Sequence, residues 1–326
     1  MMKYFLLDTM ATAELINQSN STMFNTDEFL IDTRLQVVFD METSDPDDFI
    51  TLLFLLGHPM VNLKAITIVP GTPDQISFLR YVLDRFGRSD LPLGIFNINA
   101  KPGLSKFHLK LYPNVSIRES REALDGSDVL LKYCDEKTIL ICGGPLKNVA
   151  KAIQTGQFKL GRLVAQGGFA GDNIIPEEKR LSKFNGRITC PTFNLAADTR
   201  AAKLVLDYKG IKEKFFVSKN VCHGVLYTND THEQLEKIKD KSQSLQEIYH
   251  VMSVYLNKPG KHEKAFHDPL TACCAVDLSI GQWKDVQLYM DEKTKEWGSV
   301  INENPNVKII VDYDHEKFLS TLFAYT

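Results

Sequence analysis

The amino-acid sequence predicts an α/β protein with a single open, mostly parallel sheet that is covered by helices on both faces. Three observations support this prediction. Short apolar segments alternate with segments of helical periodicity, polar clusters follow several of the apolar segments, and the 326 residues, 44% of them hydrophobic, suffice for one large core. Such alternation is typical of parallel sheets, because each return to the next parallel strand needs a long crossover, usually a helix.

The elements follow from periodicity and from residues that start or stop a helix. Thr72, Pro73 and Asp74 form a helix start, and Gly87 ends the same helix. Strands are expected at 35–39, 63–69, 91–96, 138–142, 163–165, 215–218, 286–290 and 307–312, and helices at 47–56, 73–86, 148–153, 199–207, 231–257, 271–276 and 318–323. Residues 1–34 are polar with weak periodicity and form an expected N-terminal extension. Residues 35–326 form the expected α/β domain, which adds helices and strands at its C-terminal end.

Charge and composition exclude several classes of partner. The formal net charge is -3 and the basic residues are scattered, so we expect no binding to nucleic acid or to an anionic membrane. No segment has transmembrane length, and the opening residues lack the pattern of a secretory signal. The six cysteines show no paired spacing and lie in or beside apolar or mixed segments, which is typical of buried thiols in a reducing compartment. The sequence therefore predicts a cytoplasmic protein with a small-molecule substrate.

An acidic cluster follows the first predicted strand. The nine residues 40–48 contain five carboxylates, which are Asp40, Glu42, Asp45, Asp47 and Asp48. Carboxylates at this density repel one another unless positive charge lies among them, and a hard divalent cation is the simplest resident. The alternative is a helix with an acidic N-terminus, in which Asp45 or Asp47 caps the first turn. One or two acids would serve that purpose and five exceed it, so the cluster favours a metal site.

Other polar segments also follow predicted strands. They lie at 143–145, 167–168 and 218–223, and the carboxyl ends of the strands in such a sheet are where ligands bind. We expect these segments to converge with the acidic cluster in one site. A later pair, His267 and Asp268, stands at the start of a predicted helix. It is either a cap with a polar neighbour or the completion of a metal shell.

Five motifs occur in a fixed order along the chain. They are the acidic segment 40–48, Gly144-Pro145-Leu146-Lys147-Asn148, Gln166-Gly167-Gly168 with Asp172-Asn173, Thr192-Phe193-Asn194 with Asp198, and His267-Asp268-Pro269. In this order and spacing, from residue 35 to about residue 325, the chain resembles the inosine-uridine-type nucleoside hydrolases, a family of calcium-dependent N-ribohydrolases. Each motif alone is weak, but five in register are difficult to obtain by chance. The altered acidic motif makes the chain a divergent member.

The resemblance implies a calcium site made from distant parts of the chain. Asp48 and Asp268 would bind calcium through their side chains, and Gly143 would bind it through its backbone oxygen. Glu42 takes the place of the aspartate that both ligates calcium and acts as the catalytic base, because the motif here is one residue longer than usual and lacks its Pro-Gly. Asp40 and Asp45 are the alternatives to Glu42.

The resemblance also implies which residues contact the substrate. Asp47 and Asn194 would bind the ribose hydroxyls, Thr72 would lie near the ribose, and Asn173 would reach toward its 5′ side. His267 is the candidate for protonating the departing base, and the alternative is a histidine that is only hydrogen-bonded at a helix start.

One departure from the family concerns the 5′ side of the ribose. Thr192 stands where the family has a glutamate that recognises the 5′ hydroxyl, and the insertion 177–191 adds four cations, which are Lys179, Arg180, Lys183 and Arg187. Loss of an anion and gain of cations favours a negatively charged 5′ substituent such as phosphate. The alternative is a solvated surface loop.

The expected function is hydrolysis of the N-glycosidic bond of a ribonucleoside or a related N-ribosyl compound, as in purine or pyrimidine salvage. A calcium ion would hold the ribose hydroxyls and the water that attacks the anomeric carbon, and a carboxylate would take the proton of that water. The resemblance also implies a homo-oligomer. Two alternatives remain open: a metal-dependent phosphohydrolase, and a homologue that binds a nucleoside or metabolite without turning it over.

Overall fold

The structure is a computed structural model that describes residues 32–101, 103–303 and 307–325. The unit Arg34–Thr326 is compact. The expected N-terminal extension, residues 1–34, lies almost entirely outside the described residues. None of the helices in the described ranges combines the length and the apolar character of a membrane span.

At the centre of this unit, the residues that the structure describes form an eleven-stranded sheet. Its strands lie side by side in the order β4 (Leu124–Asp125), β3 (Leu93–Ile95), β2 (Val61–Ile68), β1 (Leu35–Met41), β5 (Ile139–Cys142), β6 (Leu160–Gln166), β8 (Ile211–Val217), β13 (Val307–Tyr313), β11 (Gly281–Met290), β12 (Trp297–Ile301) and β7 (Thr189–Cys190). All neighbours from β4 to β13 are parallel, and β11, β12 and β7 continue the sheet in antiparallel pairs. The prediction of an open, mostly parallel sheet is confirmed.

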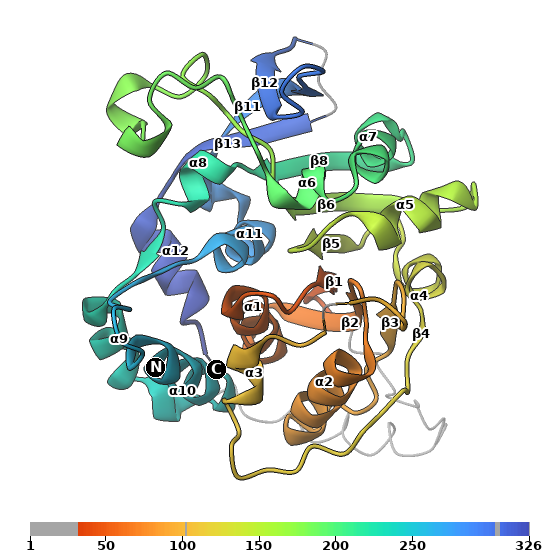
Figure 1. Cartoon of the computed structure of the whole chain (residues 1–326), viewed down its shortest axis with the longest axis vertical. Coiled ribbons are helices and arrows are strands. Elements are labelled where there is room, and N and C mark those ends of the chain that lie inside the picture. Colours follow the sequence, from red (N-terminus) through yellow and green to blue (C-terminus); the bar gives the residue numbers. More distant parts are fainter. Residues whose placement is uncertain (1–31, 102, 304–306, 326) are drawn as a thin grey trace, which may run out of the picture. The chain divides into compact units, whose positions relative to one another are not determined.

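Helices cover both faces of the sheet. Figure 1 shows α1 (Pro46–Gly57) and α11 (His267–Val276) on one side, where they pack against each other, and α4 (Gly126–Tyr133), α5 (Lys147–Gln154) and α7 (Thr199–Asp207) on the other. The other helices are α2 (Pro73–Arg85), α3 (Lys106–Leu109), α6 (Phe193–Ala196), α8 (Lys219–Cys222), α9 (Asn229–Glu236), α10 (Gln243–Leu256) and α12 (His315–Leu322). A separate two-stranded sheet joins β9 (Leu226–Tyr227) to β10 (Lys264–Ala265).

The strand order places a topological switch point between β1 and β5. From β1 the chain moves outward to β2, β3 and β4, and it then returns to the other side of β1 to form β5, β6 and β8. The loops that leave β1 and β5 therefore diverge to opposite faces, which leaves space outside their carboxyl ends. The acidic segment 40–48 and the segment 143–145 occupy this position.

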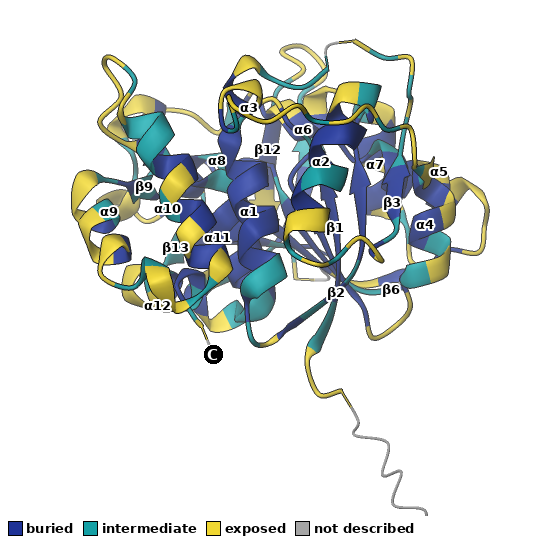
Figure 2. Cartoon of the chain, turned by 90° about the horizontal axis from the view of Figure 1, so that it is seen from below, coloured by how far each residue is buried: buried dark blue, intermediate teal, exposed yellow. Residues whose placement is uncertain are grey.

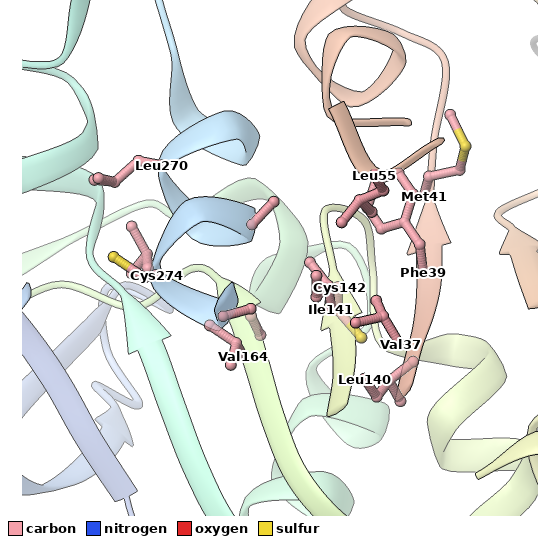
Figure 3. Packing of buried hydrophobic residues seen from close by; sticks show 14 of the residues in the cluster. Val37, Phe39, Met41, Leu55, Leu140, Ile141, Cys142, Val164, Leu270 and Cys274 are labelled. Atoms are coloured by element: carbon pink, nitrogen blue, oxygen red, sulfur yellow. The ribbon is translucent and has the colours of Figure 1, made fainter. Parts of the chain in front are cut away.

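The core explains why α1 can carry the acidic segment. Apart from Asp47, Asp48 and Thr51 the helix is made of apolar residues up to Leu56, and it is buried from Pro46 to Leu55, as the dark blue ribbon in Figure 2 shows. Side chains of β1 and β5, such as Phe39 and Ile141, share this core with Leu270 and Cys274 of α11 (Figure 3). Dense packing on all sides holds the first turn of α1 and the first turn of α11 in fixed positions.

The structure differs from the predicted elements in a few places. The helix expected at 231–257 is two helices, α9 and α10, because Ser242 begins a new helix by accepting a hydrogen bond from the Leu245 amide at 3.2 Å. Sequence analysis also missed α4, which is short, and β12, which pairs with β11 as a hairpin. The strands β6 and β8 begin earlier than expected.

Candidate active site

The acidic segment is shaped by the start of α1. Asp45 is the N-cap residue, its carboxylate accepts a hydrogen bond from the Asp47 amide at 3.4 Å, and Pro46 follows it. This start directs Asp47 and Asp48 inward, and both are buried. Asp45 thus caps the helix, as the capping alternative allowed, while Asp47 and Asp48 line the cavity described below.

Asp48 and Asp268 meet beside Gly143. A Cβ atom on Gly143, at the carboxyl end of β5, would overlap Oδ1 of Asp48 and would lie 3.0 Å from Oδ1 of Asp268. Asp268 belongs to the first turn of α11, where the His267 amide donates a hydrogen bond to Oδ2 of Asp47 at 3.1 Å. The early acidic segment and the late His-Asp pair therefore lie together, and only glycine at 143 permits this approach.

Asp48 and Asp268 form no ion pair with a basic side chain in the described ranges, and their pKa values are raised. Burial, followed by the charges of Glu42 and Asp47, raises the pKa of Asp48 well above its usual value, and burial followed by the charge of Asp48 does the same for Asp268. Burial is also the main reason that the pKa of Glu42 rises to about 7. Oδ1 of Asp268 has no hydrogen-bond donor among the described residues. A cation would relieve all of these costs at once.

The donor atoms here suit a hard cation. Asp48, Asp268 and the backbone oxygen of Gly143 supply oxygen only, and Glu42 lies at the edge, where its amide donates to Oδ1 of Asp48 at 3.1 Å. In the described ranges, no group of three or more His, Cys, Asp or Glu side chains is arranged as a metal site. The set that gathers is thus two carboxylates and a carbonyl, with a third carboxylate nearby.

A buried lysine accounts for part of the acidic cluster. Lys264, in β10, places its ammonium group 2.9 Å from Asp45 Oδ1 and 3.3 Å from Asp47 Oδ1. Burial alone would raise the pKa of Asp47, but the charge of Lys264 and several hydrogen bonds hold it below its usual value. Sequence analysis missed this residue, since β10 is too short to give a periodic signal. Among the described residues the cluster therefore has one cation of its own, which pairs with Asp45 and Asp47 and leaves Glu42, Asp48 and Asp268 without an ion pair.

Asp40 lies beneath the site rather than in it. Its Oδ1 accepts hydrogen bonds from Thr67 Oγ1 at 2.6 Å and from Asn148 Nδ2 at 2.8 Å, and burial raises its pKa to about 6 against these bonds. Asp40 is fully buried and does not line the cavity described next. Asn148, from the second motif, thus has a structural contact here.

A cavity of about 270 Å³ opens at this position. It is lined by Glu42, Ser44, Asp45, Asp47, Asp48, Gly143, Gln166, Thr192, Phe193, Asn194, Lys219, His223, His267 and Asp268. Asn194 is central, because its Nδ2 donates to the Gly143 oxygen and to Gln166 Oε1, both at 2.8 Å. Most of the residues expected in the site are brought together here.

Two expected substrate contacts do not line the cavity. Thr72 is occupied in a capping box, in which its amide donates to Gln75 Oε1 at 2.8 Å. Asn173 is exposed and its Nδ2 donates to the Ser299 backbone oxygen at 2.8 Å.

Two histidines, His267 and His223, line one wall of the cavity, and a buried cysteine lies beside one of them. Nδ1 of His267 lies 3.2 Å from Cys222 Sγ, and the His267 and His223 ring centroids are 4.6 Å apart. Burial lowers the pKa of His267 to about 4 and that of His223 to about 3, so both rings are neutral near pH 7. A neutral imidazole donates from one nitrogen and accepts at the other. His267 is therefore suited to hydrogen bonding with a base, and not to acting as a standing cation.

The insertion 177–191 brings one of its four basic side chains close to the cavity. Lys179 pairs with Asp312 at 2.8 Å, and Arg180 and Arg187 lie 3.5 Å from Asp172 and Glu296 respectively. Only Lys183 reaches the wall, with Nζ 2.9 Å from Nδ1 of His223. A second cation, Lys219, belongs to the segment 218–223, which was expected to join the site, although no role was predicted for its side chain. It lies in the four-residue helix α8 and lines the cavity.

Comparison of sequences relates the chain to known hydrolases. The family model described as inosine-uridine preferring nucleoside hydrolase matches residues 37–320. An uncharacterized protein of Aquifex aeolicus is 29% identical over 296 residues, which cover 87% of this chain and 96% of that protein. The pyrimidine-specific ribonucleoside hydrolase RihA of an Enterobacter species is 24% identical over 321 residues, which cover 88% of this chain and 96% of RihA.

Solved structures of similar fold agree with this relationship. A plant nucleoside hydrolase has a TM-score of 0.65 at 20% identity, covering 88% of this chain and 96% of its own. The inosine-uridine preferring nucleoside hydrolase of Bacillus anthracis has a TM-score of 0.63 at 19% identity, covering 88% and 98%. These likenesses show a shared fold, and the family model spans almost all of the α/β domain. The chain belongs to the inosine-uridine preferring nucleoside hydrolase family and is an N-glycosyl hydrolase.

Proposed function

We propose that this enzyme uses calcium to hydrolyse the N-glycosidic bond of a ribonucleoside or a related N-ribosyl compound in the cavity described above. The observation that carries the proposal is the meeting of Asp48, Gly143 and Asp268, which come from the start of α1, the end of β5 and the start of α11. The packing of these three elements does not require two buried carboxylates beside one glycine. A bound cation would explain why they lie there.

The residues present fit a calcium ion. Asp48, Asp268 and the Gly143 oxygen would hold it, and Glu42 is a further carboxylate at the edge of the site, with the half-buried Asp45 as its alternative. The unpartnered Oδ1 of Asp268 and the raised pKa values of Asp48 and Asp268 support this assignment. When bound, the ion would supply Lewis acidity toward a water molecule and a point of attachment for the ribose diol.

Asp47 and Asn194 would orient the ribose. Lys264 and the His267 amide hold Asp47 as an anion inside the cavity, so it can accept hydrogen bonds from sugar hydroxyls. Asn194 is fixed by the Gly143 oxygen and Gln166, so its amide has one orientation. Through these two contacts, binding of the sugar would also hold its anomeric carbon in a fixed position.

Glu42 would accept a proton from water, and His267 would hold a proton toward the departing base. Glu42 lines the cavity next to Asp48, so its carboxylate is placed to take a proton from the attacking water. The neutral His267 would donate a hydrogen bond to the departing base, whose nitrogen receives the electron pair of the broken C–N bond. Cys222, next to Nδ1, limits the orientations of the ring.

Product analysis tests the proposal. Incubation of inosine and uridine, and of their 5′-monophosphates, with calcium should release free base, and the variants Asp48→Asn and Asp268→Asn should release base at rates lower by about 10² or more. Asp230→Asn, at an exposed position in α9, is the matched control and should keep full activity. Release of inorganic phosphate without free base would indicate a phosphohydrolase. Tight ligand binding without any product would indicate a binding protein.

We also propose that the enzyme forms a homo-oligomer and works in the cytoplasm. The first part is supported by the resemblance to the family, and the second by the six cysteines, which are all free and buried. Light scattering of the purified enzyme tests the first part, since a molar mass equal to that of one chain at micromolar concentration would contradict it.

A further inference from the structure

The cavity has a second wall whose charge is opposite to that of the acidic cluster. This basic wall consists of Lys219, His223 and Lys183. Lys219 and His223 line the cavity, and the ammonium group of Lys183 lies 2.9 Å from His223 Nδ1. Burial and then the charge of His267 lower the pKa of His223, and the charges of Lys183 and Lys219 lower it further. The two cations therefore act on the same part of the wall.

These two lysines have no carboxylate partner in the part of the chain that the structure describes. The Lys219 ammonium group donates to the Pro191 backbone oxygen at 2.7 Å, and that of Lys183 lies beside the neutral His223 ring and over the face of Phe184. Neither forms an ion pair within the described ranges, whereas the neighbouring Lys179, Arg180 and Arg187 each lie near an acid. Two uncompensated charges thus remain at the cavity.

Thr192 supplies an independent observation at the same place. Its side chain lines the cavity and is 2% exposed, and Oγ1 has no hydrogen-bond partner among the described residues. Thr192 directly follows Pro191, the residue that holds Lys219. A buried hydroxyl without a partner costs free energy, which a ligand oxygen would remove. The hydroxyl and the two ammonium groups can all donate hydrogen bonds, so together they suit an anion with several acceptor oxygens.

We propose that the basic wall and Thr192 bind the 5′-phosphate of a ribonucleoside 5′-monophosphate, which the enzyme hydrolyses in preference to the free nucleoside. The inference rests on the proposed function, since the same cavity must hold the ribose. Phosphate oxygens accept hydrogen bonds from both ammonium groups and from the hydroxyl, and each bond to a charged donor is stronger than a neutral one. A free 5′ hydroxyl would leave both cations without a partner.

The reaction remains a simple hydrolysis. A bond forms between the water oxygen and C1′, the bond from C1′ to the base nitrogen breaks with its electron pair on the base, and the base gains a proton in exchange for one lost by water. The phosphate ester at the 5′ position is untouched. The products are the free base and ribose 5-phosphate, and no oxidant or further reactant is required.

Kinetics with paired substrates test the preference. We expect kcat/KM for inosine 5′-monophosphate and uridine 5′-monophosphate to exceed kcat/KM for inosine and uridine by about ten- to hundredfold. Lys219→Met and Lys183→Met should each lower this ratio, and Lys212→Met should leave it unchanged. Lys212 is an exposed lysine in β8 that pairs with Glu136 at 2.7 Å, so it controls for the loss of one charge. A ratio of one or less in the wild type would overturn the inference.

A binding measurement separates this inference from the proposed function. Calorimetry in calcium should show tighter binding of ribose 5-phosphate than of ribose, with the difference reduced in Lys219→Met. If no substrate releases base but this difference is present, the phosphate site stands and the hydrolytic function fails. If nucleosides are cleaved as fast as monophosphates and both sugars bind equally, the hydrolytic function stands and the phosphate site fails. Thermal melting of each variant verifies that it is folded.

Discussion

Gly143 controls the distance between two carboxylates that would otherwise stay apart. Asp48 and Asp268 both face the position that a Cβ on this residue would occupy. The backbone oxygen of the same residue accepts a hydrogen bond from Asn194, so one glycine links the acidic cluster to the expected sugar contacts. The site therefore depends on the lack of a Cβ atom at Gly143 as much as on the carboxylates of Asp48 and Asp268.

Gly143→Ala tests this dependence. The new methyl group would displace Asp48 Oδ1, so we expect kcat/KM to fall by about 10² or more while the fold is kept. Steady-state assays and thermal melting provide the two readouts. Gly87→Ala, at a turn with no neighbouring atom near its Cβ, is a control for the loss of a glycine, although its φ of 64° disfavours alanine and costs some stability. An unchanged kcat/KM in Gly143→Ala would refute the role of this glycine.

Lys264 gives a second prediction for a single residue. Lys264→Met leaves Asp47 buried without its cation, and removal of one partner from such a pair costs about 3–5 kcal/mol. Urea unfolding in a chelator should show this loss of the free energy of unfolding. The double variant Asp47→Asn with Lys264→Met should regain part of it, because no uncompensated charge remains. Equal stability of the single and double variants would contradict the pairing.

At the scale of elements, the site is formed where strands end and helices begin. The acidic segment joins β1 to α1, Gly143 ends β5, and Asp268 begins α11. These ends can be predicted, because apolar periodicity locates the long strands and helices and because capping residues mark where the helices start. These signals offered Asp45 or Asp47 as the cap, and the structure has Asp45. The meeting of 40–48 with Asp268 was expected from the resemblance to the family, because the local pattern left the His-Asp pair as either a cap or part of a metal shell.

Other parts of the site could not be predicted from local patterns. Lys264 lies in a strand of two residues, and so short an element has no measurable period. The segment 218–223 was expected at the site, but the part that the ammonium group of Lys219 takes in it was not. The contact between Lys264 and Asp47 joins segments that are far apart in the sequence, so only the folded chain reveals it. The expected contacts of Thr72 and Asn173 with the ribose remain predictions that the cavity lining does not include.

The junction of α7 and β8 provides a prediction for an element. Lys214, in β8, is buried, and its ammonium group donates to the Leu206 and Tyr208 backbone oxygens at the end of α7, at 2.8 and 2.7 Å. Burial lowers the pKa of Lys214 to about 8, below that of the unfolded chain. The unfolded chain therefore holds its proton between about pH 8 and 10.5 while the folded chain has lost it, and the Lys214 contribution to stability rises with pH in this window.

This pH dependence can be isolated by difference. The free energy of unfolding of the wild type minus that of Lys214→Met, measured in urea at several pH values, should rise by about 2–3 kcal/mol from pH 8 to pH 10.5. Groups other than Lys214 cancel in the difference. A flat or falling difference would show that the ammonium group is not held in this buried position.

At the scale of the whole molecule, distant parts of one chain close around a single cavity. The sheet brings the acidic segment of the first half and the His-Asp pair of the last quarter to the switch point between β1 and β5. A ligand that contacts both should therefore stabilise the folded unit as a whole. Calcium is the ligand whose chemistry suits the carboxylates that meet there.

Calcium should raise the thermal stability of the enzyme. A ligand that binds only the folded state at a hundred times its Kd adds about 2.7 kcal/mol to the free energy of unfolding. Scanning calorimetry should show a higher Tm in calcium than in chelator, with the increase lost in Asp268→Asn and kept in Asp230→Asn. The same increase in Asp268→Asn would place the calcium elsewhere.

A crystal soaked in calcium and ribose tests the central claim most directly. We expect one ion in contact with Asp48, Asp268 and the Gly143 oxygen, with the ribose diol on the ion and beside Asp47 and Asn194. An ion bound away from these three residues, or a sugar seated in the cavity without any ion, would contradict the account.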